Sequence, residues 1–185
     1  MTPHQVRLLP PGELLDAAAQ VRAVYAAAFG GPPWHEPAQR ADAYLERLAQ
    51  DALRPSFTAA AATSPDGRLL GFATAWTTPD PFPDDRCHPR VAAALGPDRT
   101  RGWLCGARVV DELAVRPGHT GRGIGAALLA AVTADAVDGR CWLLTTGAPG
   151  GPLDFYLHQG WHRADPGTDD PAVLLGPRHP ARARP

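Results

Sequence analysis

The spacing of apolar residues in the first part of the chain predicts two amphipathic helices and an antiparallel hairpin. Apolar positions recur at helical intervals over residues 13–29 and 41–52. Two strand-like runs follow at residues 57–63 and 68–77. The four residues between these runs, Ser64-Pro65-Asp66-Gly67, fit a type I turn. We therefore expect the two runs to pair as a hairpin.

The rest of the chain predicts a sheet with helices on its faces. A β-branched run at residues 108–115 predicts a buried strand, and residues 121–137 predict the helix that follows it. Further strands and one short helix are expected at residues 6–9, 141–146, 153–159 and 172–175. The order β-α-α-β-β-β-α-β-α-β predicts an α+β fold, a mixed sheet with a parallel βαβ centre.

A long proline-rich segment, residues 79–106, lies between the hairpin and the β-branched strand. It shows no clear period before residues 91–95. Loops of this length in a compact domain are usually functional or mobile. This segment is therefore the candidate substrate lid.

Length and composition indicate one globular domain. The chain has 185 residues, of which 44% are hydrophobic and 20% are charged, as is typical of folded proteins. We expect a single domain over residues 1–176 and a disordered basic tail over residues 177–185. The formal net charge is −1, so no overall basic field favours nucleic acid as a partner.

The sequence predicts a cytoplasmic protein without a metal site. No run approaches the ~20 apolar residues that a membrane span requires. Residues 1–10 contain two prolines and lack the apolar core of a secretion signal. The three cysteines, Cys87, Cys105 and Cys141, are far apart. They show neither the density of a disulfide scaffold nor the spacing of a zinc site.

The most informative segment follows the strand at residues 108–115. Gly121, Gly123 and Gly125 alternate there, where a tight turn opens a helix. Glycine places no side chain between the backbone and an incoming group, and the first N–H groups of a helix have no partner within it. The helix dipole adds partial positive charge at the same end. The turn is therefore a candidate binding site for an anion such as a pyrophosphate.

Three interpretations of this turn compete on the residues alone. A nucleotide P-loop requires Gly-Lys-Ser/Thr, which does not follow here. A Rossmann turn requires an acidic residue about 20 positions further on, after the next strand. That strand ends in Thr145-Thr146-Gly147, without a carboxylate. The third interpretation is a glycine-rich helix start that binds no ligand.

Two signatures together resemble the GNAT superfamily of N-acetyltransferases. The family turn, Gln/Arg-x-x-Gly-x-Gly/Ala, is matched by Gly123 and Gly125, with the basic Arg122 between glycines. Downstream, the run Phe155-Tyr156-Leu157-His158-Gln159-Gly160-Trp161 is similar to the family signature Phe-Tyr-x-x-x-Gly-Phe. The two signatures lie in the family's order and spacing, separated by one helix and one strand.

The resemblance implies a fold and a coenzyme site. It implies a GNAT-like mixed sheet flanked by helices, with splayed central parallel strands, and acetyl-CoA as the cosubstrate. The pantetheine arm would be bound by the backbone of Leu113, Ala114 and Val115, and the Arg122 side chain would add a charge-assisted contact to the pyrophosphate. The pyrophosphate itself would lie on the turn residues Thr120, Gly121, Arg122, Gly123, Gly125 and Ala126.

Tyr156 and Glu112 are the candidate catalytic residues. A tyrosine has an ordinary pKa of about 10, against about 8.5 for a thiol, so Tyr156 is the candidate acid for the departing thiolate. Glu112 lies on the strand that the resemblance places beside the acetyl group, and it is the candidate base. Asp111 points to the opposite face if strand alternation holds, and a β-bulge would change which carboxylate faces the site. The alternatives are a Tyr156 that only packs near the coenzyme and a Glu112 paired with a nearby arginine.

These features predict an N-acetyltransferase that transfers an acetyl group from acetyl-CoA to the amine of a small molecule, by direct attack in a ternary complex. A protein or peptide amine is the alternative acceptor, and a non-catalytic acyl-CoA-binding module is the alternative class. Two departures from the family pattern favour the module: Thr120 stands where Gln or Arg is preferred, and residues 147–152 lack an asparagine that many members have. A homodimer is compatible with the resemblance.

Overall fold

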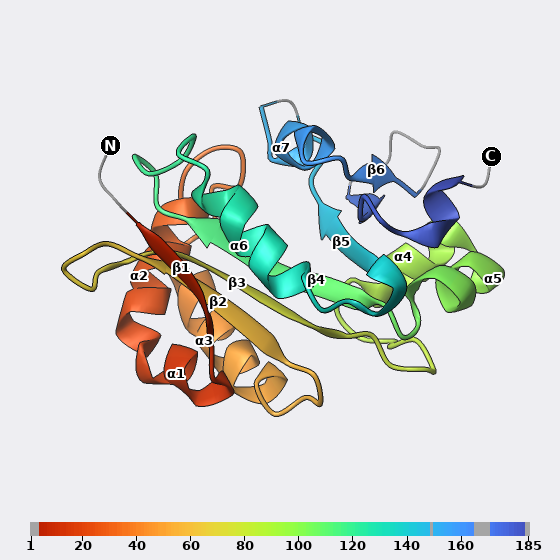
Figure 1. The fold of residues 1–185 in the computed structure, drawn as a ribbon, viewed down its shortest axis with the longest axis horizontal. Helices are drawn as coiled ribbons and strands as arrows, with labels where there is room; N and C mark the ends of the chain where they lie inside the picture. The colour runs from red at the N-terminus through yellow and green to blue at the C-terminus, as the bar shows by residue number, and fades with distance from the viewer. Residues whose placement is uncertain (1–3, 149, 165–170, 184–185) are drawn as a thin grey trace. The chain divides into compact units, whose positions relative to one another are not determined.

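The chain forms two compact units that share one strand. The computed structural model describes residues 4–148, 150–164 and 171–183 (Figure 1). Unit 1 consists of Met1–Trp76 and Asp111–Ala134, and unit 2 of Thr77–Val110 and Asp135–Pro185. Strand β4 (Arg108–Val115) contributes residues to both units. The single domain expected over residues 1–176 stays a prediction.

Unit 1 contains three antiparallel strands followed in the sheet by β4. β1 (Gln5–Leu9) and β3 (Leu69–Thr77) both pair antiparallel with β2 (Thr58–Thr63), and β4 follows β3 in the strand order. In the β2–β3 turn the Gly67 N–H donates a 2.9 Å hydrogen bond to the Ser64 carbonyl. The hairpin predicted from the Ser-Pro-Asp-Gly sequence is therefore confirmed.

The helices of unit 1 cover both faces of this sheet (Figure 1). α1 (Pro11–Asp16), α2 (Ala18–Phe29) and α3 (Gln39–Asp51) form one apolar core with Ala59 and Ala61 of β2. α6 (Ile124–Thr133) packs against β1 and β2. Ala60 and Ala62 are also buried, and they face the other side because side chains alternate along a strand. The run of small alanines in β2 therefore lets helices approach both faces closely.

Two helices of unit 1 differ in length from their predictions. The helix predicted at residues 13–29 is interrupted at Ala17, whose φ is −90° and ψ is 20°, so that α1 and α2 are separate. The helix predicted at residues 121–137 is shorter, because Gly123 takes a left-handed conformation immediately before α6. Hydrophobic periodicity does not detect either change, since one residue outside helical geometry leaves the apolar spacing almost intact.

Unit 2 contains the parallel part of the sheet. β4 pairs parallel with β5 (Cys141–Thr145), from Arg108 opposite Cys141 to Val110 opposite Leu143. β5 pairs antiparallel with β7 (Ala172–Leu175), and β7 pairs antiparallel with β6 (His162–Arg163). α7 (Leu153–His158) precedes β6. Among the described residues the strand order is β1-β2-β3-β4-β5-β7-β6, which confirms the predicted mixed sheet.

The proline-rich segment at residues 79–106 is more regular than predicted. It contains α4 (His88–Leu95), α5 (Pro97–Arg99) and a π-helix at Thr100–Leu104. Its prolines did not prevent helix formation because α4 and α5 each carry proline in their first turn, where the missing N–H has no partner to lose. We call this segment the insertion.

The chain beyond residue 176 also differs from its prediction. A 3-10 helix spans Pro180–Ala183, and His179 is only 3% exposed. The His179 Nδ1 accepts a 3.1 Å hydrogen bond from the Ala181 N–H, and its Nε2 lies 3.0 Å from the Trp103 carbonyl. Because Nδ1 accepts a hydrogen bond, the ring proton lies on Nε2, which donates a hydrogen bond to the Trp103 carbonyl. His179 and Ala181 are therefore held by specific contacts, whereas residues 184–185 of the predicted tail lie outside the described part.

Candidate functional site

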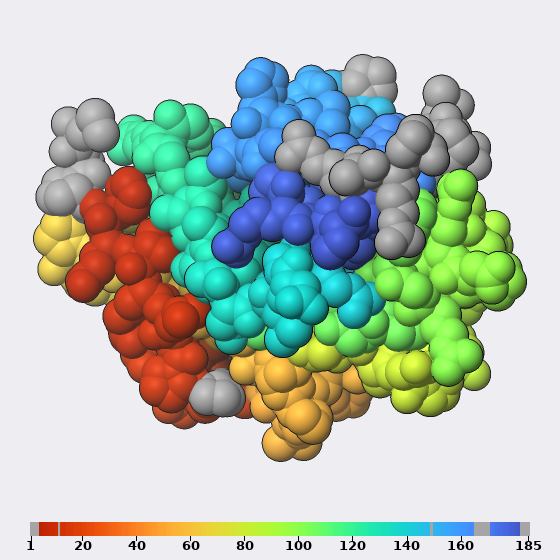
Figure 2. Space-filling view, turned by 45° about the vertical axis from the view of Figure 1, so that its right-hand side comes forward, coloured from red at the N-terminus to blue at the C-terminus, as the bar shows by residue number. Residues whose placement is uncertain are grey.

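The turn between β4 and α6 is built on glycines in left-handed backbone conformations. Gly118, Gly121 and Gly123 have φ values of +76°, +71° and +80°, which residues with a side chain rarely adopt. A Cβ at any of the three would meet no atom within 4 Å. Glycine is therefore required here by the backbone conformation and not by crowding. Residues 120–123 are exposed, and Figure 2 shows this part of the chain, in green, at the molecular surface.

The same turn presents a row of backbone N–H groups. Those of residues 120–126 donate to no acceptor in the parts of the chain that the structure describes. The first hydrogen bond of α6 runs from the Ala127 N–H to the Gly123 carbonyl, at 3.0 Å. Exposed donors at the start of a helix attract anions. The predicted phosphate-binding residues therefore lie together in one turn, and Leu113, Ala114 and Val115 lie on the strand that leads into it.

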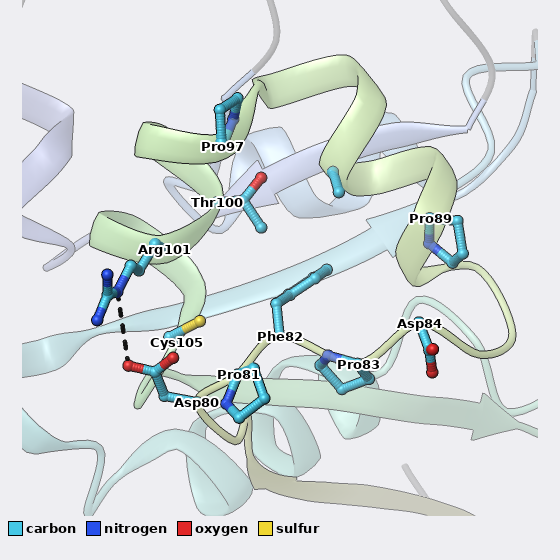
Figure 3. Close-up of a pocket in the computed structure, with 11 residues that line it drawn as sticks. Asp80, Pro81, Phe82, Pro83, Asp84, Pro89, Pro97, Thr100, Arg101 and Cys105 are labelled. Atoms are coloured by element: carbon cyan, nitrogen blue, oxygen red, sulfur yellow. Dashed lines mark ion pairs between the residues drawn. The ribbon is translucent and has the colours of Figure 1, made fainter.

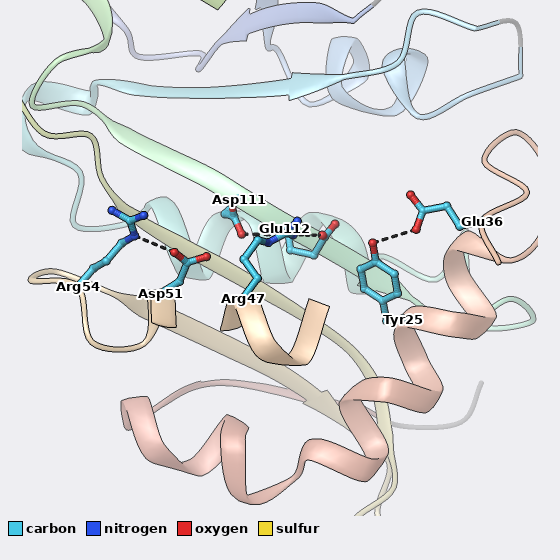
Figure 4. A network of polar contacts seen from close by, with 7 residues as sticks. All are labelled: Tyr25, Glu36, Arg47, Asp51, Arg54, Asp111 and Glu112. Atoms are coloured by element: carbon cyan, nitrogen blue, oxygen red, sulfur yellow. Dashed lines mark hydrogen bonds and ion pairs between the residues drawn. The ribbon is translucent and has the colours of Figure 1, made fainter. Parts of the chain in front are cut away.

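Two carboxylates on β4 contact one arginine of α3 (Figure 4). The Arg47 Nη2 lies 3.0 Å from Glu112 Oε2 and 3.7 Å from Asp111 Oδ2. The Arg47 guanidinium also lies over the Tyr44 ring, 5.0 Å from its centroid, at a distance suited to a cation–π interaction. The Glu112 side chain is 14% exposed and the Asp111 side chain 17%. The charges of this cluster are therefore largely removed from water.

Asp111 and Glu112 contact the same guanidinium although they are neighbours on a strand. Regular alternation would turn them to opposite faces. The expectation that Asp111 points away from Glu112 is therefore wrong, because both carboxylates reach the Arg47 guanidinium. The ion pair that was the alternative for Glu112 is confirmed, and Arg47 is the partner. This pairing does not exclude a role in proton transfer, because it determines the environment in which Glu112 titrates.

The environment of Glu112 changes its proton affinity. Burial raises the pKa of Glu112 to about 8, and the charges of Asp111 and Glu36 act in the same direction. Arg47 and the backbone N–H of Leu113 lower this pKa. A carboxyl group that titrates near 8 can give up and take back a proton close to neutral pH, which is the property that a general base needs.

A tyrosine–glutamate pair lies in the same part of unit 1 (Figure 4). The Tyr25 hydroxyl donates a 2.9 Å hydrogen bond to Glu36 Oε2. The Tyr25 ring stacks on Tyr44 at a centroid distance of 4.7 Å, and Tyr44 stacks on Phe72 at 5.6 Å. Burial and the charges of Glu112 and Glu36 raise the pKa of Tyr25. Tyr25 therefore remains a neutral donor, and the aromatic stack fixes its position.

Arg47, Tyr25 and Glu36 were not predicted as site residues. Arg47 follows Tyr44 by three positions, so both lie on one side of α3. A cation beside the apolar stripe of an amphipathic helix was the only local signal. Nothing local connects residue 47 with residue 112, because their contact arises from the packing of α3 near β4.

Tyr156 belongs to unit 2, where it is a buried residue of α7. Its ring contacts those of Phe155 and Trp161, with centroids 5.1 and 6.2 Å apart. Gly160 has a φ of +81° and ends the helix, as the position after a C-terminal cap requires. The Phe-Tyr-x-x-x-Gly-Trp run is thus a short helix, its glycine stop and an aromatic contact. The acid role of Tyr156 stays a prediction.

The insertion in unit 2 carries an open pocket of about 610 Å³ (Figure 3). Four prolines line the pocket, together with Phe82 and Asp80 among others. At its edge Arg101 lies 3.7 Å from Asp80. Thr100 also lines the pocket, and its buried hydroxyl has no hydrogen-bond partner among the described residues. The insertion therefore has a concave surface, and its role as a lid stays a prediction.

The described ranges 4–148, 150–164 and 171–183 contain neither a metal-binding cluster nor a helix that could span a membrane. No three His, Cys, Asp or Glu side chains there are arranged to hold a metal ion, and no helix there is long and apolar enough to cross a membrane.

Burial raises the pKa of the Cys105 thiol, and it raises the pKa of the Cys141 thiol to about 11. Both thiols are therefore protonated near neutral pH.

The mixed sheet and the glycine-rich turn between β4 and α6 agree with the order of elements that the GNAT resemblance implies. The profile of the Acetyltransferase (GNAT) family matches residues 19–161. This match covers more than half of the chain, so the chain belongs to the GNAT acetyltransferase family. Acetyl-CoA is the cosubstrate typical of this family.

Solved structures share the fold at low sequence identity. PH1933 from Pyrococcus horikoshii OT3 aligns with a TM-score of 0.62 and 14% identity, covering 93% of this chain and 98% of that one. The PaiA N-acetyltransferase from Thermoplasma acidophilum, solved in complex with coenzyme A, aligns with a TM-score of 0.58 and 14% identity. The alignment covers 94% of this chain and 98% of that one. A structure named histone acetyltransferase HPA2 and related acetyltransferase, from Corynebacterium glutamicum, aligns with a TM-score of 0.59 and 20% identity. The alignment covers 92% of this chain and 94% of that one. No curated protein matches the sequence.

Proposed function

We propose that the chain transfers an acetyl group from acetyl-CoA to the amine of a small molecule, by direct attack within a ternary complex. The observation that carries the proposal is the row of N–H groups at residues 120–126, which have no acceptor in the described chain. This row directly follows the strand that carries Glu112. An anion-binding turn and a candidate proton acceptor are thus joined by one short stretch of backbone.

The residues of the turn fit the pyrophosphate of coenzyme A. Gly121 and Gly123 leave the backbone accessible, and the exposed Arg122 supplies a cation for a charge-assisted contact. The backbone of Leu113, Ala114 and Val115 would hold the pantetheine arm. Bound acetyl-CoA supplies a thioester whose acetyl group can be transferred. An N–H of this strand that donates to the thioester carbonyl would contribute about 3–4 kcal/mol to the reaction.

Two side chains would move protons in this reaction. Glu112 takes a proton from the ammonium form of the acceptor, which frees the nitrogen lone pair. The nitrogen forms a bond to the acetyl carbon, and the bond from that carbon to sulfur breaks. Tyr156 supplies the proton that the departing thiolate takes up, and the second proton, which the nitrogen loses as it becomes an amide, returns to Tyr156. The raised pKa of Glu112 supports its part, because a stronger base takes a proton from an ammonium group more readily.

A small amine is the acceptor that we favour over a protein amine. Glu112 and Asp111 are largely buried, so a slender free amine can approach them more easily than a lysine on a folded protein. Glu36, Asp111 and Glu112 outnumber Arg47, which favours a cationic acceptor. A cytoplasmic location and a homodimer remain predictions.

An amine panel with acetyl-CoA tests the proposal. Release of free thiol would be followed for polyamines, amino sugars, aminoglycosides and lysine peptides, and calorimetry would measure coenzyme A binding. We expect coenzyme binding and thiol release with at least one small amine, and a large loss of turnover in Glu112→Gln. Turnover on lysine peptides alone would replace the small-molecule acceptor with a protein one. Coenzyme binding without turnover on any amine would indicate a binding module, and absence of coenzyme binding would refute the proposal entirely.

A further inference from the structure

We infer that Arg47 is a positioning residue for the proposed reaction: it holds the carboxylates of Asp111 and Glu112 at one guanidinium, so that Glu112 serves as the proton acceptor. The inference rests on the proposed function for the role of Glu112. It adds a residue from α3 that neither the glycine-rich turn nor the Phe-Tyr signature includes.

The geometry of Arg47 is constrained at several points. Its Nη2 lies 3.0 Å from Glu112 Oε2 and 3.7 Å from Asp111 Oδ2, and its guanidinium lies 5.0 Å from the centroid of the Tyr44 ring. Tyr44 is itself fixed between the rings of Tyr25 and Phe72. The guanidinium therefore has an aromatic ring on one side and two carboxylates within reach, which restricts the positions that Glu112 can take.

The charges around Glu112 make this contact necessary. Five side chains interact with Glu112 or with its partners. They are Tyr25 from α2, Tyr44 and Arg47 from α3, Glu36 between these helices, and Asp111 from β4. Three of these groups can be charged, and only Arg47 among them is a cation. A buried carboxylate with two anionic neighbours would hold its proton too tightly to act as a base near neutral pH. Arg47 offsets that effect.

Arginine suits this role better than lysine. Its guanidinium is planar, has several N–H donors, and stacks on an aromatic face while it contacts carboxylates. An ammonium group is a point charge, and it cannot span two carboxylates in the same way. We therefore expect Arg47→Lys to restore part of the electrostatic effect and less of the positioning.

The test compares Arg47→Gln and Arg47→Lys with Arg54→Gln as the matched control. Arg54 is also a half-buried arginine of unit 1: it pairs with Asp51 at 2.7 Å and lies 4.2 Å from the centroid of a Trp76 ring. The readouts are the pH profile of kcat/KM on the acceptor found in the amine panel, the affinity for coenzyme A, and a carbon-13 NMR titration of the Glu112 side chain. The NMR titration requires no activity.

For Arg47→Gln we expect the pKa of Glu112 to rise by about one unit or more, since a nearby opposite charge shifts a carboxyl by 1–3 units. The acid limb of kcat/KM then moves by the same amount, and activity at pH 7.5 falls about tenfold and recovers at higher pH. Arg47→Lys should lie between wild type and Arg47→Gln. Coenzyme affinity should change less than twofold, and Arg54→Gln should keep the wild-type profile even if it lowers the melting temperature.

Each outcome decides one claim. If Arg47→Gln leaves the Glu112 titration unchanged, the inference is refuted, whether or not the protein is an enzyme. If the pKa of Glu112 shifts but the acid limb of the kcat/KM profile does not move with it, Arg47 does not position the base. If Arg54→Gln moves the profile as far as Arg47→Gln, the effect is a general loss of structure and the inference is overturned. If no amine is acetylated by the wild type, the proposed function fails, while the NMR titration still shows whether Arg47 controls Glu112. If Arg47→Gln does not fold, Arg47→Lys is judged by the same two readouts.

Discussion

The Trp142 indole N–H donates a 2.7 Å hydrogen bond to the Thr78 hydroxyl, and both side chains are 1% exposed. Thr78 also bonds through its backbone, donating to Ala107 and accepting from Gly106. One residue therefore ties the two ends of the insertion together and connects them to β5. A buried indole N–H that loses its acceptor costs about 1–3 kcal/mol, because water cannot replace the lost partner.

Thr78→Val should lower the free energy of unfolding by about 1–3 kcal/mol. Valine has nearly the same shape but cannot accept the indole hydrogen bond. Thr78→Ser keeps the hydroxyl and should lose about 1 kcal/mol, the contribution of the deleted methyl group. Urea unfolding monitored by tryptophan fluorescence measures both. A valine variant as stable as wild type would contradict a structural role for this hydrogen bond.

Gly123→Ala should weaken coenzyme A binding about tenfold or more. Gly123 has a φ of +80°, and an alanine in that conformation costs about 1–2 kcal/mol. A shift of the backbone to relieve this strain would turn the N–H groups of the turn away from a bound phosphate. Gly31→Ala is the matched control, since its φ is not positive and a Cβ there meets no atom within 4 Å. Calorimetry that shows the same affinity for both variants would argue against a phosphate site in this turn.

Glu112→Gln should change how stability depends on pH. The folded-state pKa of Glu112 is about 8 and its ordinary value is 4.5, so between these values the folded protein binds more protons than the unfolded chain. Stability from this group is therefore fully present at the acid end and falls as the pH rises toward 8. The glutamine variant lacks this loss. We therefore expect its free energy of unfolding, relative to that of wild type, to increase by on the order of 3 kcal/mol from pH 5 to pH 8. Urea titrations at the two pH values measure the difference, and parallel curves would show that Glu112 is not perturbed.

Tyr156→Phe should reduce turnover about 100-fold, within the usual contribution of a positioned acid. The ring contacts with Phe155 and Trp161 do not need the hydroxyl, so the fold should be retained. Coenzyme affinity should stay within about twofold of wild type if the hydroxyl acts only on the departing thiolate. Steady-state kinetics and calorimetry distinguish the two effects, and unchanged turnover would remove Tyr156 from the proposed chemistry.

Local patterns in the sequence were sufficient for much of the fold. The Ser-Pro-Asp-Gly turn predicted the β2–β3 hairpin, and the β-branched run at residues 108–115 predicted β4 within one mixed sheet. Helix limits were less accurate, because Ala17 and Gly123 interrupt helical geometry without disturbing the apolar spacing. The insertion was misjudged since its prolines occupy first-turn positions, where they are compatible with a helix.

The candidate site was only half accessible from the sequence. The glycine-rich turn is a local signal, so its free N–H groups could be predicted from consecutive residues. The contact of Arg47 with Glu112 could not, because it depends on the packing of α3 near β4 and leaves no trace in residue spacing. The prediction for Asp111 failed for the same reason, since alternation describes an ideal strand and says nothing of where a long arginine side chain from another element can reach.

The burial of His179 has a consequence for the response of the Pro180–Ala183 helix to acid. Burial lowers the pKa of His179, so near neutral pH its imidazole keeps the neutral form that bridges the Ala181 N–H and the Trp103 carbonyl. Acidification below the ordinary histidine range would place a second proton on the ring, abolish the acceptor for the Ala181 N–H, and weaken the start of the Pro180–Ala183 helix.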